Sequence, residues 1–582
     1  MVIWESPHPH LDIPKDITTW QWAFESLIYS PLLSNPPPRP GSYINAVTHE
    51  RLDFAQVKLH AVALSTALIR WHGLQPGDTV SLFATNTVWY PVAMWATLRA
   101  GGRVNGASPA YTAEEMAHAL RTAGTKFLFT LPSSLDVALE AAAQASLPSS
   151  RIFLLEGGRG GFVTIHDLIA TGSLQTPVSA YRIPMGTTNQ DICGYLNFSS
   201  GTTGLPKAVM LSHHNIIAQC HQLAQLQVVT PGEPYRMLAV TPLFHITGLV
   251  RSCHYPVHLN GECILLPAFH LPTMCRTIIA HRIEELILVP PILIRLVQDP
   301  AAAEYHPQLR RVVKRFSSGS APTSPEIIRA LQRIFPDTGF RQGYGATEST
   351  ACISCHPPSH YDYRYAHTGG LACANTRVKV LSIPSSDSDD EEQQQQPRRE
   401  LGPGEIGEIC AQGPQIAMGY LENPRATAET FQNGWFHTGD VGHVDAEGLL
   451  HISDRLKEMI KVKGQQVAPA ELEDCLLGHA AVADCAVLGI PDAYAGERPK
   501  AFVVLRPGIE ANEAKGKELM EFVRGRKVRW KGLVEVEFVN GIPKSATGKL
   551  LRRVLKTRER EVGREKGLVV RENESHQKRA RL

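Results

Sequence analysis

Residues 196–207 have the composition of a loop that holds a polyphosphate; they read LNFSSGTTGLPK. Glycines let backbone N–H groups approach phosphate oxygens closely, hydroxyls add donors, and Lys207 adds a compact positive charge. A Walker A loop does not fit, because Pro206 precedes the lysine and Ala208, which has no hydroxyl, follows it. The alternative is a flexible surface loop rich in serine, threonine and glycine. The residues predicted to bind phosphate are Ser199, Ser200, Gly201, Thr202, Thr203, Gly204 and Lys207.

Five further short segments also combine glycine with hydroxyl-bearing or charged residues. They read TPLFHITGL at 241–249, QGYGATE at 342–348, GWFHTGD at 434–440, DRLKEMIKVKG at 454–464 and PKSATGK at 543–549. Together with 196–207 they resemble, in the same order along the chain, the motifs of the adenylate-forming superfamily. That superfamily includes acyl-CoA synthetases, 4-coumarate–CoA ligases, luciferases and the adenylation domains of peptide synthetases. Six motifs in one order argue against chance similarity.

The resemblance implies that a carboxylic acid is activated with ATP. Attack of the carboxylate on the α-phosphate forms an acyl adenylate and expels diphosphate, so that AMP becomes the leaving group. Because negative charge gathers at the α-phosphate, the site needs cations and N–H donors directed at that point. Coenzyme A would then take the acyl group through its thiol.

The same resemblance implies a separate role for each charged or hydroxyl-bearing residue of the motifs. Lys207 would hold the β- and γ-phosphates, and Thr347 would donate to the α-phosphate. Glu348 would bind Mg²⁺, a hard ion that prefers oxygen ligands. Asp440 would accept hydrogen bonds from both ribose hydroxyls. Lys549 would reach the bridging and carboxylate oxygens during adenylation. Taken singly, each charged group could be an ordinary surface charge.

Other motif residues would form the pockets. Tyr344 would stack on adenine, and His245 would lie between the acid and the path by which the thiol enters. The alternative for His245 is a satisfied core or capping residue. Arg251 could pair with a polar acyl group, but a surface position is the expectation that we prefer. The residues placed around adenine and the acyl group are Gly319, Ser320, Ala321, Gln342, Gly343 and Tyr344, and those placed toward the acid are His245, Thr247, Arg251 and Gly319.

The segment at 454–464 resembles a hinge and implies a second conformation. In the enzymes that it resembles, the small domain swings between the half-reactions, removing the Lys549 loop and bringing in the loop around Lys463. One departure is the LPAF run at 266–269, where coumarate ligases carry a lysine near the CoA path. Two alternatives therefore stay open: another acceptor, such as a carrier protein or oxygen, and a non-catalytic acyl or nucleotide binder. The hinge residues expected to contact nucleotide or CoA are Arg455, Lys457, Lys461, Lys463 and Gly464.

Composition and charge exclude several classes of protein and of binding partner. The chain has 582 residues, which exceeds one ordinary core and predicts at least two domains. Its net charge of +2 argues against nucleic acid as the main partner. No run of about 18 apolar residues occurs, and the N-terminus has no apolar segment, so neither a membrane span nor a signal peptide is expected.

Eleven cysteines without regular spacing suggest reduced thiols. The CISCH run at 352–356 matches a haem-attachment pattern, but we favour small residues on a strand beside the nucleotide site.

Apolar runs at 80–84 and 103–104 flank a helical pattern at 92–100, and such alternation predicts βαβ units. The predicted fold is therefore α/β, with a large N-terminal domain at 1–453 and a smaller C-terminal domain at 454–560. The resemblance further implies that the large domain has two α/β subdomains plus a small β-barrel near 378–409, and that the α+β C-terminal domain is mobile. The acidic, glutamine-rich run at about 383–400 lacks apolar residues and is expected to be a disordered insertion without a catalytic role.

A polar tail at 561–582 ends in Ala580-Arg581-Leu582, a conservative variant of the S-K-L peroxisomal address. A peroxisomal import receptor is therefore an expected partner, and the cytoplasm is the alternative location. The alternative interpretation is a solvated basic tail that ends in leucine.

Overall fold

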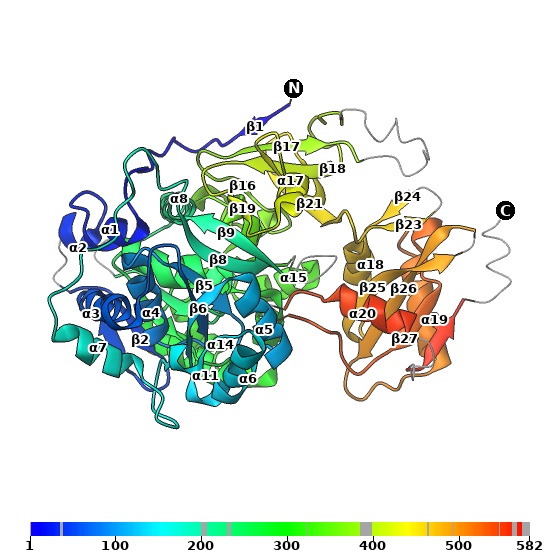
Figure 1. Ribbon diagram of the computed structural model, residues 1–582. Helices are drawn as coiled ribbons and strands as arrows, with labels where there is room; N and C mark the ends of the chain where they lie inside the picture. Colours follow the sequence, from blue (N-terminus) through cyan, green and yellow to red (C-terminus); the bar gives the residue numbers. More distant parts are fainter. Residues whose placement is uncertain are drawn as a thin grey trace.

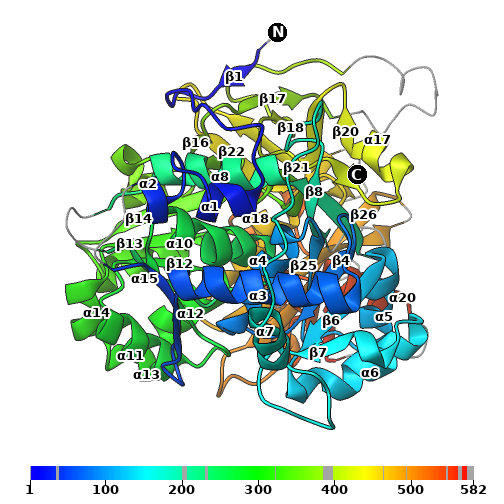
Figure 2. The same cartoon turned by 60° about the vertical axis from the view of Figure 1, so that its left-hand side comes forward.

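The structure is a computed structural model and describes residues 2–34, 39–199, 206–229, 234–321, 323–383, 398–462, 465–492, 494–545, 548–561 and 567–572. The chain forms a large body and a smaller lobe, which holds the described residues from 460 onward (Figures 1 and 2). Within the described ranges, no helix combines the length and the apolar composition that crossing a bilayer requires.

A seven-stranded sheet carries the two strands on either side of the predicted phosphate loop. Its inner strands pair in parallel, whereas the strands at the phosphate-loop edge are antiparallel. The strand order is β19 (Gly419–Tyr420), β9 (Lys207–Ser212), β8 (Cys193–Ser199), β5 (Arg103–Ala107), β4 (Thr79–Phe83), β6 (Thr125–Thr130) and β7 (Ile152–Leu154). Every residue of β4 is buried, as expected for a parallel strand covered on both faces.

Helices connect and cover these strands. They are α3 (Phe54–His72), α4 (Trp89–Arg99), α5 (Ala113–Thr122), α6 (Leu135–Gln144), α7 (Ile165–Ser173) and α8 (His213–Gln225). Capping boxes start α3, α5, α7 and α8, where Asp53, Thr112, Thr164 and Ser212 accept from the third helical N–H. The polar residue at each start therefore fixes where the helix begins.

A nine-stranded sheet forms the second layer. Its order is β16 (Leu371–Ala372), β15 (Ser354–Cys355), β14 (Gly339–Tyr344), β13 (Arg315–Ser318), β12 (Glu285–Leu288), β10 (Arg236–Ala239), β11 (Glu262–Leu265), β2 (Ser42–Asn45) and β3 (Arg51–Asp53). The helices that follow its strands include α11 (Leu271–His281), α12 (Pro290–Gln298), α14 (His306–Val312) and α15 (Pro325–Ile334). One apolar cluster contains Tyr43 and Met237 of this sheet together with Val80 and Tyr195 of the first. The two α/β layers therefore share a core.

An antiparallel sheet occupies the place of the expected small β-barrel. It runs β1 (Trp4–Glu5), β17 (Arg377–Leu381), β18 (Gly407–Gln412), β21 (Trp435–Val444) and β20 (Phe431–Gln432), with β22 (Leu450–Arg455) also paired to β21. The short edge strand β1 brings the N-terminus onto this sheet (Figure 1).

The smaller lobe has its own sheet and its own apolar cluster. The sheet runs β24 (Gln465–Val467), β23 (Ile460–Val462), β26 (Gly496–Leu505), β27 (Glu535–Phe538) and β28 (Val569–Arg571), with β25 (Val482–Asp492) paired to β26. Its helices are α18 (Pro469–Leu477), α19 (Glu513–Arg524) and α20 (Arg552–Arg560). Asp454 and Arg455 still lie in β22, so the strands of this lobe begin only at Ile460.

Several sequence predictions can be compared directly with these elements. The βαβ unit at 80–104 is confirmed, since β4 and β5 pair in parallel on either side of α4. The strand interpretation of 352–356 is also confirmed, because β15 pairs with β14. The insertion at 383–400 falls mostly at 384–397, and these residues, like 580–582 of the tail, lie outside the described residues.

A buried cation ties α20 to the sheet of the small lobe. Lys500 Nζ lies 2.9 Å from Glu537 Oε2 and 2.8 Å from Glu559 Oε2, and Glu535 also pairs with it. The Lys500 side chain has no exposed surface. Because α20 follows the predicted lysine loop at 543–549, this cluster anchors the C-terminal end of that loop.

We expect Lys500→Met to destabilise the small lobe by about 3–5 kcal/mol, since it leaves buried carboxylates without their cation. Hydrogen exchange of β25, β26 and β27 amides, measured by mass spectrometry with increasing urea, would report this loss. Lys517→Met is the matched control, because Lys517 and its partner Glu513 are largely exposed. A variant at Lys500 that exchanges like the control would contradict the anchoring role.

Candidate active site

Asp440 is the buried carboxylate of the site. It lies in β21 opposite Arg455 of β22. Arg455 Nε lies 3.1 Å from Asp440 Oδ1, and the Tyr344 hydroxyl donates to Oδ2 at 2.8 Å. Burial raises the pKa of Asp440, although Arg455 and Tyr344 oppose this. Since each carboxylate oxygen has a further lone pair, Asp440 can still accept from ribose hydroxyls.

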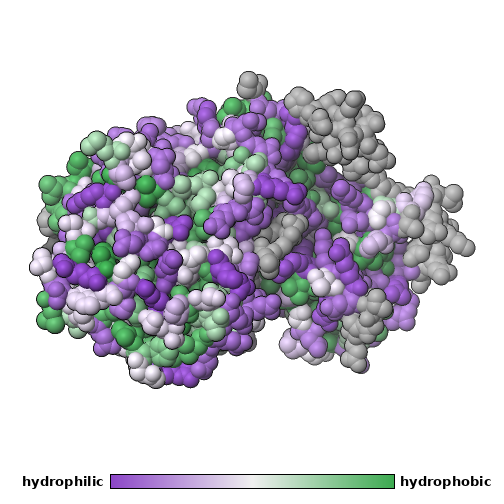
Figure 3. Space-filling view, in the orientation of Figure 1, coloured by the Kyte–Doolittle hydropathy of each residue, from purple (hydrophilic) through white to green (hydrophobic). Residues whose placement is uncertain are grey.

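Lys549 comes from the small lobe, and its loop packs on the large body. A Cβ on Gly548 would lie 2.3 Å from Pro291 Cγ in the first turn of α12, and Gly548 has φ of +79°. Glycine therefore allows both the turn and the close approach. Figure 3 shows a hollow where the two parts of the molecule meet, bordered mainly by hydrophilic residues on the face shown. This packing places the lysine loop at the junction of the two lobes.

Four groups of the large body interact with the charge of Lys549: Arg455, Asp440, Glu348 and His245. Burial and then Arg455 lower the pKa of Lys549, whereas Asp440 and Glu348 raise it. Burial and then Lys549 lower the pKa of His245 to about 4. The tertiary structure thus brings Lys549 within range of the charges of Asp440, Glu348 and His245, although these residues are far apart in the sequence.

The backbone before His245 is held by the first sheet. Asn197 Nδ2 of β8 donates to the Phe244 carbonyl at 2.9 Å, and a Cβ on Gly106 would lie 2.8 Å from the same oxygen. His245 caps α9 (Ile246–Gly248), where its Nδ1 accepts from the N–H of Thr247 at 3.4 Å. A neutral imidazole that accepts at Nδ1 carries its proton on Nε2. His245 is thus both a capping residue and part of the site.

Tyr420, which the sequence analysis did not identify, contacts both Glu348 and Lys207. The Tyr420 hydroxyl donates to Glu348 Oε1 at 2.9 Å, and Lys207 Nζ lies 4.9 Å from the centre of the Tyr420 ring. Tyr420 reaches this position because β19 pairs with β9, the strand that Lys207 begins. A lone Gly-Tyr pair carries no motif signal, so only strand pairing could reveal it.

Two buried polar atoms of the predicted nucleotide site have no hydrogen-bond partner within the described part of the chain: Gln342 Oε1 and Ser199 Oγ. Buried polar groups are normally satisfied, so such atoms are expected where a ligand binds. Ser320 in the neighbouring turn has φ of +72°, a conformation that costs energy for a residue with a side chain. These observations fit the predicted nucleotide pocket.

Not every predicted residue joins this cluster. Thr347, Thr247, Gly319, Ala321 and Gly343 are half-buried, whereas Lys457 and Lys461 have exposed side chains for which the structure shows no contact with the cluster. Ser200, Gly201, Thr202, Thr203, Gly204, Lys463 and Gly464 lie outside the described residues. The hairpin of β8 and β9 nevertheless fixes both ends of the phosphate loop, because Ser199 pairs with Lys207.

The expectation that Arg251 is a surface residue is wrong. Its side chain is only 4% exposed, and it lies in the π-helical turn η3 (Leu249–His254), all of which is buried. Its guanidinium carbon lies 5.6 Å from the centre of the Tyr255 ring. The prediction was wrong because charged residues are usually exposed. The contacts with α8 and α9 that enclose η3 form only in the folded chain.

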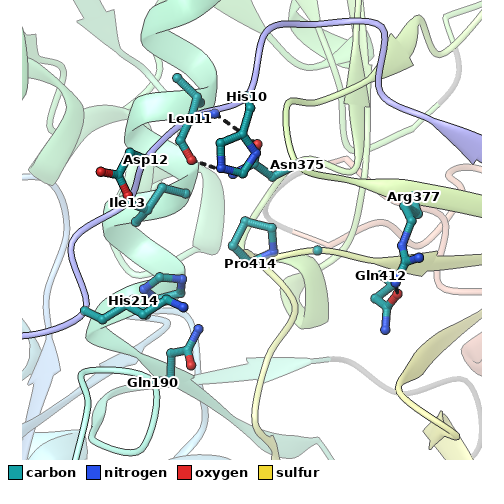
Figure 4. Close-up of a pocket in the computed structure, with 12 residues that line it drawn as sticks. His10, Leu11, Asp12, Ile13, Gln190, His214, Asn375, Arg377, Gln412 and Pro414 are labelled. Carbon is teal, nitrogen blue, oxygen red and sulfur yellow. Dashed lines mark hydrogen bonds between the residues drawn. The ribbon is translucent and has the colours of Figure 1, made fainter.

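A separate pocket of about 410 Å³ lies between the N-terminal segment and the antiparallel sheet (Figure 4). Asn375 Nδ2 donates to the Leu11 carbonyl at 2.7 Å and holds the N-terminal segment over it. The pocket shares no residue with the cluster around Asp440, and we assign it no role in the chemistry. Its lining is His10, Leu11, Asp12, Ile13, Lys15, Gln190, His214, Asn375, Arg377, Gln412, Gly413 and Pro414.

Known proteins match both parts of the chain. Residues 38–421 match the AMP-binding enzyme family, and residues 471–549 match the AMP-binding enzyme C-terminal domain. The 4-coumarate–CoA ligase 2 of Oryza sativa subsp. japonica is 32% identical over 572 residues, covering 96% of this chain and 95% of that protein. The 4-coumarate–CoA ligase-like 1 of Arabidopsis thaliana is 31% identical over 558 residues, covering 95% and 96%.

Solved structures agree over nearly the full length. The ATP-bound RpMatB-BxBclM chimera B1 has a TM-score of 0.79 at 27% identity and covers 94% of this chain and 100% of its own. ATP-bound MatB from Rhodopseudomonas palustris, at 24% identity, shows the same fold with a TM-score of 0.78 and coverage of 94% and 100%. The resemblance drawn from the motifs and the expected α/β fold with a C-terminal domain are therefore confirmed. This chain belongs to the AMP-binding enzymes of the adenylate-forming superfamily and, within them, to the acid–thiol ligases related to 4-coumarate–CoA ligase.

Proposed function

We propose that this chain activates a carboxylic acid with ATP as an acyl adenylate and then transfers the acyl group to coenzyme A. The observation that carries the proposal is the position of Lys549, which enters from the small lobe into the field of Asp440 and Glu348. A preorganised cation at the point where charge develops is what the adenylation step requires. The lobe arrangement described here therefore corresponds to the first half-reaction.

The chain's own residues bind and orient ATP in this proposal. Asp440 accepts from the ribose, Gln342 Oε1 accepts from the amino group of adenine, and Lys207 with the loop after β8 holds the outer phosphates. Lys549 donates to the oxygen that bridges the acid and the α-phosphate, and Thr347 donates to an α-phosphate oxygen. Holding the two reactants in line converts a bimolecular step into an intramolecular one.

Glu348 fits the expected Mg²⁺. Its carboxylate is half-buried, forms no ion pair among the described residues, and accepts from the neutral Tyr420 hydroxyl. Carboxylate oxygens of this kind suit a hard divalent ion. When bound there, Mg²⁺ would neutralise charge on the phosphates.

The second half-reaction requires the lobe to move about the hinge after Arg455. In the present arrangement Arg552 of α20 pairs with Glu458 of the hinge and, at 2.6 Å, with Glu473 of α18. The relatives named as CoA ligases support coenzyme A as the acceptor. The thiolate would attack the adenylate carbonyl, form the thioester bond and release AMP with the electron pair of the broken bond.

The test is AMP release by the purified protein with ATP, Mg²⁺, coenzyme A and a panel of carboxylic acids. We expect release to depend on both the acid and coenzyme A, to stop on chelation with EDTA, and to yield an acyl-CoA of the correct mass. Adenylate formation without a thioester for every acid would point to another acceptor. Absence of AMP release with every acid would contradict the proposal.

We expect Lys549→Ala to slow adenylate formation by about 10²- to 10³-fold, because it removes one charged donor from the transition state. Transfer from chemically supplied acyl-AMP to coenzyme A should stay close to the wild-type rate. Lys544→Ala is the matched control, since Lys544 lies in the same loop but pairs with Asp484 at 2.6 Å. Lys463→Ala should show the opposite bias. Equal loss of both half-reactions in Lys549→Ala would contradict a role confined to adenylation.

The location is a separate proposal that rests on sequence alone. We propose that Ala580-Arg581-Leu582 is bound by a peroxisomal import receptor. A fluorescent protein fused to the N-terminus should then mark peroxisomes in a eukaryotic cell, and removal of Leu582 should make the signal diffuse. Diffuse fluorescence from the intact fusion would refute this address and favour the cytoplasm.

A further inference from the structure

Arg251 follows His245 and Thr247, two residues that the sequence analysis placed toward the acid. Thr247 stands four residues before it, one helical turn away, and such residues share a face. Both Thr247 and His245 are half-buried, so each keeps some accessible surface. The π-helical turn η3 begins at Leu249, directly after this stretch, and π-helical turns occur frequently at functional sites.

The guanidinium of Arg251 forms no ion pair with a carboxylate of the described residues, although its charge acts on the pKa of Glu285. Its side chain is 4% exposed, and its Nη1 has no hydrogen-bond partner in the described part of the chain. No ion pair among the described residues includes Arg251, although the Tyr255 ring offers it a weaker cation–π contact. A buried charge without a partner is costly, so a counter-charge is expected when the site is filled.

Glu285, the buried carboxylate on whose pKa Arg251 acts, already has other and stronger partners. Glu285 pairs through Oε1 with Arg341, and its Oε2 accepts from Gln227 Nε2 at 2.6 Å and lies 3.8 Å from Arg315 Nε. Glu285, Arg341 and Arg315 thus form a cluster that already has an excess of cations. Arg251 cannot be explained as the partner of Glu285.

Arg251 also reaches the wall of the predicted acyl pocket. Burial and Cys355 raise the pKa of the Cys352 thiol to about 11, while Arg251 acts in the opposite direction, which places the two side chains together. A Cβ on Gly343 would lie 3.5 Å from Cys352 Sγ. Cys352 is half-buried, and its N–H donates to Gln219 Oε1 at 2.7 Å, which fixes its backbone. Arg251, Cys352 and Gly343 are therefore neighbours, and Thr247 lies one helical turn before Arg251.

Resting on the proposed ligase function, we propose that the acid carries a second carboxylate remote from the one that is activated, and that Arg251 binds it. A carboxylate accepts two parallel hydrogen bonds from the planar guanidinium and neutralises its charge. A neutral acceptor such as a hydroxyl would satisfy hydrogen bonds but leave the buried charge. The substrate class is therefore dicarboxylic acids, in which one carboxyl reacts and the other anchors.

The test compares matched acids that differ only at the remote end. Straight-chain dicarboxylic acids from succinic to sebacic acid are paired with monocarboxylic acids of equal length, and kcat/KM for AMP release is measured with coenzyme A. We expect at least one dicarboxylic acid to exceed its partner by about 10²- to 10³-fold, and Arg251→Met to remove that preference. Arg251→Lys, which keeps the charge but not the planar fork, should retain part of it.

Arg99→Met is the matched control. Arg99 is also a buried arginine, but its Nη1 donates to Ser65 Oγ at 2.8 Å and its Nη2 to the Val178 carbonyl. This variant can lower stability, but the ratio of the two acid classes should not change.

Calorimetric binding of the same acids to wild type and Arg251→Met separates this inference from the proposed function. Thioester formation with monocarboxylic acids alone, or an unchanged ratio in Arg251→Met, would overturn the role of Arg251 and leave the ligase function standing. Binding of a dicarboxylic acid that needs Arg251, without turnover, would support the anchor and contradict the ligase. If no dicarboxylic acid binds or reacts better than its partner in wild type, the inference is wrong whether or not Arg251→Met folds.

Discussion

The site depends on one electrostatic constraint: a cation carried by one lobe must lie among carboxylates carried by the other. Lys549 supplies the cation, and Asp440 and Glu348 supply the opposing charge. Burial lowers the pKa of Lys549, and the carboxylates work against that loss of charge. Charges interact more strongly in such a partly buried place than in water. Because the neighbours of Asp440 and those of Lys549 belong to separate apolar clusters, the placement of the two lobes decides how strongly these charges interact.

The interface between the lobes is polar rather than core-like. None of the apolar clusters of described residues contains members from both lobes. Where α18 meets α15, burial and then Glu473 and Glu326 raise the pKa of Asp474 to about 7. Glu326 belongs to the large body, so two carboxyl groups face each other across the interface. An interface with like charges and no shared core fits the proposed movement of the small lobe between the two half-reactions.

Much of the fold was predictable because its signals are local. The apolar run that became β4, the helical pattern that became α4, and the polar starts of α3 and α5 all act over a few residues. The order of strands in the sheets was not predictable from such patterns. The pairing of β19 with β9, which brings Tyr420 to Glu348 and Lys207, joins segments more than two hundred residues apart in the sequence.

The sequence alone determined the chemistry, because the kinds of residue that bind phosphate, ribose and metal occur in short ordered motifs. It identified Lys207, Asp440 and Lys549 before any contact between them was known. Only the tertiary structure decided which of these groups share one space and which charges are buried. Arg251 shows the difference: an arginine is expected at the surface, whereas packing buries this one without an ion-pair partner among the described residues. The residue type determines the charge of a side chain. Whether that charge needs a bound partner depends on its burial and its neighbours, and only the folded chain determines these.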